Sequence, residues 1–196
     1  MKAFLFSFLL TTFSCLAADA PNDTTIVIGE RVGAITPKMT LLGLKTIYGK
    51  NMKPAQLDGP EGTTLDGVKL FTGTDKELEI ILEQVGDEKI VSAVSIIGKA
   101  WTFSNGLRAD MTLEEVEKLN GKPFTISGFD WDYGGYANFE GGKLEAGVSI
   151  RFEPTTENRS EKLSGDVQIR SDDKALRAAK PKISGSISVM FPILDN

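Results

Sequence analysis

Apolar residues recur along this chain at two different periods, and the helical period marks one short segment in the second half. Three apolar residues follow Thr112 at the spacing of one helix face: Leu113, Val116 and Leu119. Thr112 and Glu115 have the spacing of a capping box, in which each side chain accepts a hydrogen bond from the other residue's backbone amide. Asn120-Gly121 supplies the residues that favour a left-handed helix end. The pattern predicts a helix of about two turns.

An earlier segment repeats this pattern. Residues 35–50 align without a gap to residues 107–122, and the matches are Met39/Met111, Thr40/Thr112, Leu41/Leu113, Gly49/Gly121 and Lys50/Lys122. Gly43 replaces the glutamate of the capping box, and an interior glycine costs up to about 1 kcal/mol of helix stability, so we expect a weaker helix here. Self-similarity of this kind indicates a folding unit that is used twice.

Apolar and polar residues alternate elsewhere, which is the period of a strand with one buried face. Strands are predicted at residues 78–83, 91–97, 124–133, 143–153 and 183–191. Residues 51–74 are rich in Gly, Pro and Asp and are predicted to form a long loop with one short strand. An alanine-rich stretch within residues 171–182 favours a short helix.

Helices this short need a sheet to pack on. A helix followed by a run of antiparallel strands, occurring twice, predicts the α+β class: two tandem modules, each a short helical layer packed on an antiparallel β-sheet. We place the first module at residues 25–100 and the second, with a C-terminal strand, at residues 101–196.

The string Gly-x-x-x-x-Met-Thr-Leu-x-x-Val-x-x-Leu-x-Gly-Lys-Pro spans residues 106–123. It resembles the helix-entry motif of the small envelope modules that include the SmpA/OmlA-type outer-membrane assembly lipoproteins and the tandem β-lactamase inhibitory proteins. The first repeat matches more loosely, with Ala34 at the leading glycine and Met52, after an inserted Asn51, at the proline. The resemblance implies a helical layer on a four-stranded antiparallel sheet and a non-catalytic protein that binds other proteins. The inhibitory proteins carry disulfides that one cysteine cannot form, so no β-lactamase partner is inferred.

The N-terminus has the three parts of a secretory signal: Lys2, an apolar run at residues 3–10, and small residues around Ala17. We predict a signal peptide over residues 1–17 and a periplasmic or secreted protein. Cys15 is alternatively the acylated first residue of a lipoprotein. The apolar run is too short to span a bilayer and no later segment approaches about 20 apolar residues, so no membrane span is expected.

The net charge and the absence of certain residue types limit which ligands and reactions the protein can support. The chain has 22 Lys and Arg against 27 Asp and Glu, a net charge of −5, which disfavours a nucleic-acid partner. It has no histidine, and its single cysteine is Cys15 within the predicted leader. Most nucleophile–base pairs and transition-metal sites therefore lack their residues, and we expect no catalysis, no cofactor and no metal.

The densest group of candidate functional residues lies in residues 128–140. If this segment is extended, its aromatic residues share one face and its aspartates the other. The aromatics then either fill the core or form an exposed anchor patch. A third interpretation makes Asp130, Asp132 and Glu140 a catalytic or calcium-binding set. The candidate binding residues are Trp101, Phe129, Asp130, Trp131, Asp132, Tyr133, Tyr136 and Phe139.

These patterns together predict an exported bacterial envelope protein that binds another envelope or secreted protein without catalysis, as an inhibitor or an assembly factor. The alternatives are a carboxylate-dependent glycan hydrolase, a glycan-binding protein, and a stress-related structural protein with no defined ligand.

Overall fold

The computed structural model describes residues 22–145, 147–156 and 160–191. The predicted signal peptide and Cys15 lie outside these residues. Strands account for 41% of the structure and helices for 18%, with three sheets and only small helices among the described residues. The predicted class, two tandem α+β modules with helices layered on separate sheets, is therefore wrong. The fold is sheet-rich.

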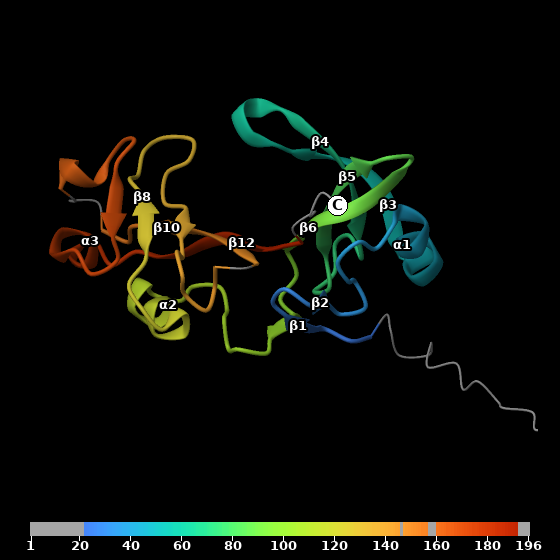
Figure 1. The fold of residues 1–196 in the computed structure, drawn as a ribbon, viewed down its shortest axis with the longest axis horizontal. Coiled ribbons are helices and arrows are strands. Elements are labelled where there is room, and N and C mark those ends of the chain that lie inside the picture. Colours follow the sequence, from blue (N-terminus) through green and yellow to red (C-terminus); the bar gives the residue numbers. More distant parts are fainter. Residues whose placement is uncertain (1–21, 146, 157–159, 192–196) are drawn as a thin grey trace, which may run out of the picture.

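The physical reason for this difference is one antiparallel sheet that draws strands from both halves of the chain. Its order is β10 (Val148–Glu153), β12 (Lys182–Met190), β6 (Glu88–Ile96), β5 (Leu78–Val85), β4 (Thr64–Leu70) and β3 (Met52–Asp58). β12 pairs with β10 on one side and with β6 on the other, and it runs between the two halves in Figure 1. Local sequence patterns contain no signal for the β12–β6 pairing, because the paired residues are far apart in the chain.

The two faces of this central sheet differ sharply. A row of paired positions on one face is apolar and at most 8% exposed: Val148, Val189, Val94, Ile80 and Val68. The adjacent row is Ser149, Ser188, Ser95, Glu79 and Lys69. Successive residues of a strand point to opposite faces, so the second row lies on the other side of the sheet. The apolar face belongs to the hydrophobic core, and the serine-containing face does not.

Two small sheets and three short helices complete the described structure. One sheet has the order β2 (Arg31–Val32), β1 (Thr25–Val27) and β7 (Thr102–Phe103), and the other β11 (Gln168–Arg170), β8 (Thr125–Ser127) and β9 (Ala137–Asn138). The α-helices are α1 (Leu41–Tyr48), α2 (Leu113–Asn120) and α3 (Lys174–Ala178), with single 3-10 turns at Gly49–Asn51, Pro60–Gly62 and Glu161–Leu163. Among the described helices, none is long and apolar enough to cross a bilayer.

Both predicted repeat helices are confirmed. In α2 the Thr112 amide donates to Glu115 Oε2 at 2.9 Å and the Glu115 amide donates to Thr112 Oγ1 at 3.3 Å, which completes the capping box. In α1 the Thr40 hydroxyl accepts from the Gly43 amide at 3.1 Å, without the reciprocal bond.

The residue before each cap also binds the central sheet. The carbonyl of Met39 accepts from Val91 in β6, and that of Met111 accepts from Ile183 in β12, both at 2.9 Å. The two repeats therefore contact the sheet through the same backbone interaction.

The strand predictions succeed in part. β5, β6 and β12 lie where alternation predicted strands, and the short helix within residues 171–182 is α3. The loop predicted for residues 51–74 is wrong, because β3 and β4 form a hairpin there. β3 is at the edge of the sheet, which is where a strand tolerates Pro54. Only Thr125–Ser127 of the strand predicted at 124–133 is formed, and the strand predicted at 143–153 begins at Val148. The division of the chain at residue 100 stays a prediction.

Candidate functional site

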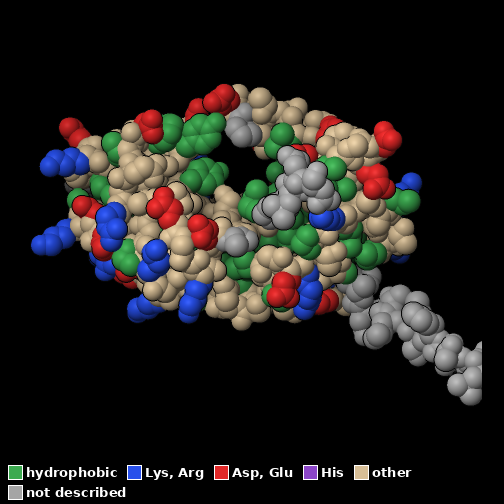
Figure 2. All heavy atoms as spheres, in the orientation of Figure 1, with side chains coloured by type: hydrophobic (Ala, Val, Ile, Leu, Met, Phe, Trp, Pro, Cys, Tyr) green, Lys and Arg blue, Asp and Glu red, His purple; other side chains and the backbone are tan. Residues whose placement is uncertain are grey.

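A cavity of about 1050 Å³ lies over the serine-containing face of the central sheet. Figure 2 shows an open space between the surrounding side chains at this place. The sheet forms its floor, the β3–β4 hairpin forms one wall, and the segment between β8 and β9 forms the opposite wall. Three elements that are distant in sequence thus converge on one hollow.

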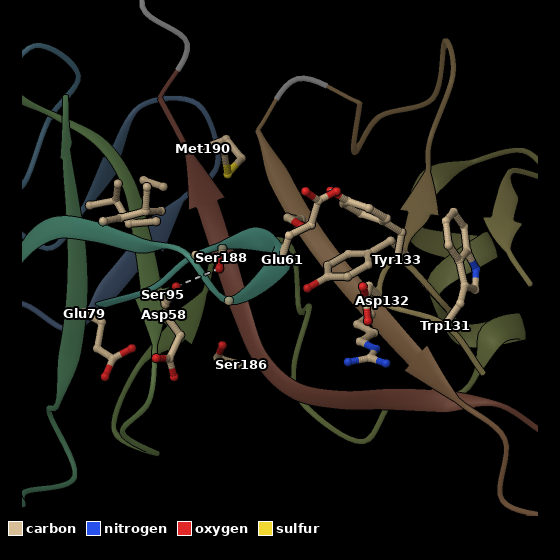
Figure 3. A pocket seen from close by; sticks show the side chains of 18 residues that line it. Asp58, Glu61, Glu79, Ser95, Trp131, Asp132, Tyr133, Ser186, Ser188 and Met190 are labelled. Carbon is tan, nitrogen blue, oxygen red and sulfur yellow. Dashed lines mark hydrogen bonds between the residues drawn. The ribbon is translucent and has the colours of Figure 1, made fainter. Parts of the chain in front are cut away.

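Small side chains give the cavity its floor. Ser95 of β6 and Ser188 of β12 are paired across the strands, and their hydroxyls share a hydrogen bond of 2.8 Å (Figure 3). Ser149 and Ser186 continue this surface. Bulky residues at these positions would fill the space, so the serines leave the sheet face open.

The first wall is the arm, which we define as residues 56–66. Between Gly67 and its tip, the hairpin is not paired with β5, so the arm projects from the sheet (Figure 1). Asp66 fixes its base, because it accepts from Gln56 at 2.7 Å and pairs with Lys89 at 2.6 Å. The bond from Lys89, and then the bond from Gln56, lower the pKa of Asp66.

Gly67 at the root of the arm is required by close packing. A Cβ there would lie 2.5 Å from the Ile80 carbonyl oxygen and from a Leu57 methyl group. The arm therefore leaves the sheet at a fixed point.

The second wall is the aromatic loop, which we define as residues 129–136. Its course is irregular because Asp130 has a φ of 67° and Gly135 a φ of 80°. A Cβ on Gly135 would lie 2.0 Å from the Phe152 carbonyl oxygen, so only glycine fits this approach. Phe129 turns into the core, whereas Trp131 and Tyr133 line the cavity. The predicted extended geometry of this segment is wrong for this reason.

Hydrogen bonds and ring contacts hold the aromatic side chains of this loop. Trp131 Nε1 donates to the Gly128 carbonyl at 2.8 Å, and its ring meets that of Tyr133 edge-on with centroids 5.4 Å apart. Arg151 lies over the Tyr136 ring at 5.8 Å, and its Nε donates to the Gly134 carbonyl at 2.9 Å. Tyr133 and Tyr136 are 40% and 41% exposed, so they offer apolar surface in a fixed orientation.

One contact joins the two walls across the opening. The Tyr133 hydroxyl donates to Glu61 Oε1 at the tip of the arm at 3.2 Å, and the two side chains point toward each other in Figure 3. The nearby negative charge of Glu61, followed by this hydrogen bond, raises the pKa of the Tyr133 phenol. The phenol therefore remains a donor to Glu61 beyond its ordinary titration range.

The eight residues predicted from sequence do not form a single group. Trp131, Asp132, Tyr133 and Tyr136 line the cavity. Phe129 and Phe139 are 4% and 3% exposed and belong to the core.

The other two predicted residues also lie outside the cavity lining. Asp130 accepts from the Ser164 hydroxyl at 2.6 Å. Trp101 packs where Gly33 leaves room for its ring, and its Nε1 donates to the Lys76 carbonyl at 3.2 Å.

The cavity also contains residues that the sequence analysis missed. Asp58 and Glu61 come from the stretch that was predicted to be a loop. Ser186 and Ser188 alternate with Ile187 and Val189, and this alternation of small and branched residues was the available signal for an open sheet face.

The three carboxylates of the catalytic interpretation are not gathered in the cavity. Asp132 lines it, whereas Asp130 bonds to Ser164 and Glu140 accepts from the Asn138 amide at 2.9 Å. Among the described residues, no group of three or more His, Cys, Asp or Glu is arranged to hold a metal ion.

Comparison of the chain with protein-family models, curated proteins and solved structures gives no significant match.

Proposed function

We propose that this protein is an exported, non-catalytic binding protein that takes a segment of another envelope or secreted protein into the cavity between the arm and the aromatic loop. The observation that carries the proposal is the open sheet face beside two tyrosines that are held in place while about two-fifths exposed. The leader sequence is the support for export.

Rigid aromatic side chains favour this function physically. Large aromatic side chains supply much of the binding energy at protein interfaces, because they bury much apolar area at low entropic cost. Trp131 and Tyr136 are oriented before any partner arrives, by the Gly128 carbonyl and by Arg151 respectively. Less conformational freedom is then lost on binding, which raises the affinity.

The cavity floor supports binding rather than turnover. Its serines lie beside other serines and a glutamate, and the chain has no histidine to activate them as nucleophiles. The resemblance of residues 106–123 to protein-binding envelope modules agrees with this proposal.

The test is affinity capture from an extract of the source cells with three forms of the protein. Ser186→Trp places a bulky ring in the cavity from an exposed floor position and leaves the Ser95–Ser188 bond intact. Ser104→Trp adds the same ring at an exposed position outside the cavity lining. We expect one protein of the extract to be retained by the wild type and by Ser104→Trp but not by Ser186→Trp. The two variants are expected to have equal thermal stability.

Two results would contradict the proposal. Equal retention by all three forms would show that the partner does not use the cavity. Retention of glycan instead of protein, lost in Ser186→Trp, would favour the glycan-binding alternative.

A further inference from the structure

The charges around the cavity are predominantly negative. Its carboxylates are Asp58, Glu61, Glu79 and Asp132. Glu79 is paired with Lys69 at 2.6 Å and so adds little net charge. Three carboxylates then remain against one cation in the lining, the guanidinium of Arg151.

Two of these carboxylates form no direct contact with a cation, although, after the bond to Glu79, the charge of Asp58 also helps to raise the pKa of the nearby Lys69. Within the described part of the chain, the carboxylates of Asp58 and Asp132 make no hydrogen bond or ion pair. Glu61 is bonded to Tyr133, a neutral phenol. Arg151 is already engaged by the Gly134 carbonyl and the Tyr136 ring. The cavity therefore offers unbalanced negative charge on both of its walls.

Aromatic faces lie beside this charge. Cations are attracted both to carboxylates and to the faces of aromatic rings, and Lys and Arg side chains combine these preferences with a long apolar stem. Tyr133 and Tyr136, each about two-fifths exposed, stand on the same wall as Asp132. An anionic occupant would instead meet repulsion from three carboxylates.

From this complementarity we infer that the occupant of the cavity is a positively charged, extended polypeptide segment. Its basic side chains lie between Asp58 on the arm and Asp132 with the tyrosines on the aromatic loop. The inference rests on the proposed function and specifies the chemistry of the partner.

The shape of the cavity fits such a segment. A volume of about 1050 Å³ is at the upper end of ligand pockets and holds a few residues, whereas a whole domain is far larger. The serine floor lets a backbone approach the sheet closely, and Figure 2 shows the hollow open to solvent. The partner's segment can therefore enter and leave the cavity as an extended strand.

The experiment follows Trp131 fluorescence in a Trp101→Phe form of the full chain. The chain has two tryptophans, so this change leaves Trp131 as the only one. The probes are capped peptides of about ten residues, long enough to cross the cavity at about 3.3 Å per residue, that alternate serine with lysine, glutamate or glycine. A neutral oligosaccharide of glucose is the fourth probe.

Two double variants separate local charge from net charge. Asp58→Asn with Asp132→Asn removes the two carboxylates that form no hydrogen bond or ion pair. Asp87→Asn with Glu88→Gln makes the same change in net charge at the exposed β5–β6 turn, outside the cavity lining. We expect saturable binding of the lysine peptide, weakened about tenfold or more by the cavity variant and less than about twofold by the control. Raising the salt concentration weakens this binding as well.

The remaining outcomes overturn the inference. Equal weakening by both double variants, or by neither, would show that the cavity carboxylates do not select a cation. Preferred binding of the glutamate or glycine peptide, or of the oligosaccharide, would assign the cavity to another occupant.

Failure of the inference is distinguishable from failure of the proposed function. A partner that Ser186→Trp loses but the double aspartate variant retains would refute the basic segment alone. Retention that no cavity variant changes would refute the proposed function.

Discussion

A buried hydrogen-bond network around Ser171 gives the sharpest stability prediction. Ser171 is fully buried, accepts from the Phe124 amide at 3.1 Å and donates to Glu117 Oε2 at 2.5 Å. Glu117 also accepts from Arg177 of α3 at 3.0 and 3.1 Å. Glu117 lies on α2, and its side chain is only 21% exposed.

Ser171→Ala removes both hydroxyl bonds where water does not reach. The Phe124 amide loses a partner, and leaving a buried donor unsatisfied costs about 1–3 kcal/mol. Glu117 keeps Arg177, so its loss is at the lower end, about 1 kcal/mol. We therefore expect the free energy of unfolding to fall by about 2–4 kcal/mol, equivalent to about 4–16 °C in Tm for a chain of this size.

The assay is urea unfolding followed by circular dichroism, with Ser186→Ala as the matched control. Ser186 is an exposed serine of β12, so its loss is expected to change stability by less than about 0.5 kcal/mol. If Ser171→Ala and Ser186→Ala have equal stability, the network does not stabilise the fold and the reasoning is refuted.

Three further predictions concern other described sites. Burial raises the pKa of Tyr48 to about 12 from 10.0, so the free energy of unfolding of the wild type should fall by up to about 2–3 kcal/mol relative to that of Tyr48→Phe as pH rises from 10 to 12. A difference between the two proteins that does not change with pH in urea titrations would contradict this. Thr112→Ala should cost about 1 kcal/mol in the same assay and Thr40→Ala less, since only α2 has the full capping box; the reverse order would count against it. Gly135→Ala should destabilise the fold more than Gly106→Ala, because both glycines have a positive φ but only at Gly135 would the new Cβ meet backbone atoms. Equal melting temperatures of the two variants would exclude that clash.

Local patterns were sufficient for elements that are stabilised by neighbours in sequence. The capping box of Thr112 and Glu115 depends on residues three positions apart, and it is present as predicted. The alternation in β5 depends on a single buried face, which is also present. Such signals do not depend on which strand lies alongside.

Long-range pairing explains what the sequence analysis missed. The β3–β4 hairpin contains Pro54 and Gly67, which usually disfavour strands, and the edge position and the packing of Leu57 make them acceptable here. The aromatic loop was predicted to be extended, but Asp130 and Gly135 turn it, so Trp131 and Tyr133 reach the cavity while Phe129 enters the core. The site therefore depends on backbone turns that residue type alone did not reveal.

The position of β12 has a consequence for how the molecule assembles. Ile96 of β6 pairs with Ile187 of β12, a separation of 91 positions (187 − 96). During synthesis, β6 is complete long before β12 emerges, and its unpaired edge can meanwhile recruit the strands of other chains. Contacts this distant in sequence also slow folding. Yield during refolding should therefore fall steeply with protein concentration, and a chain ending before residue 182 should aggregate through β6.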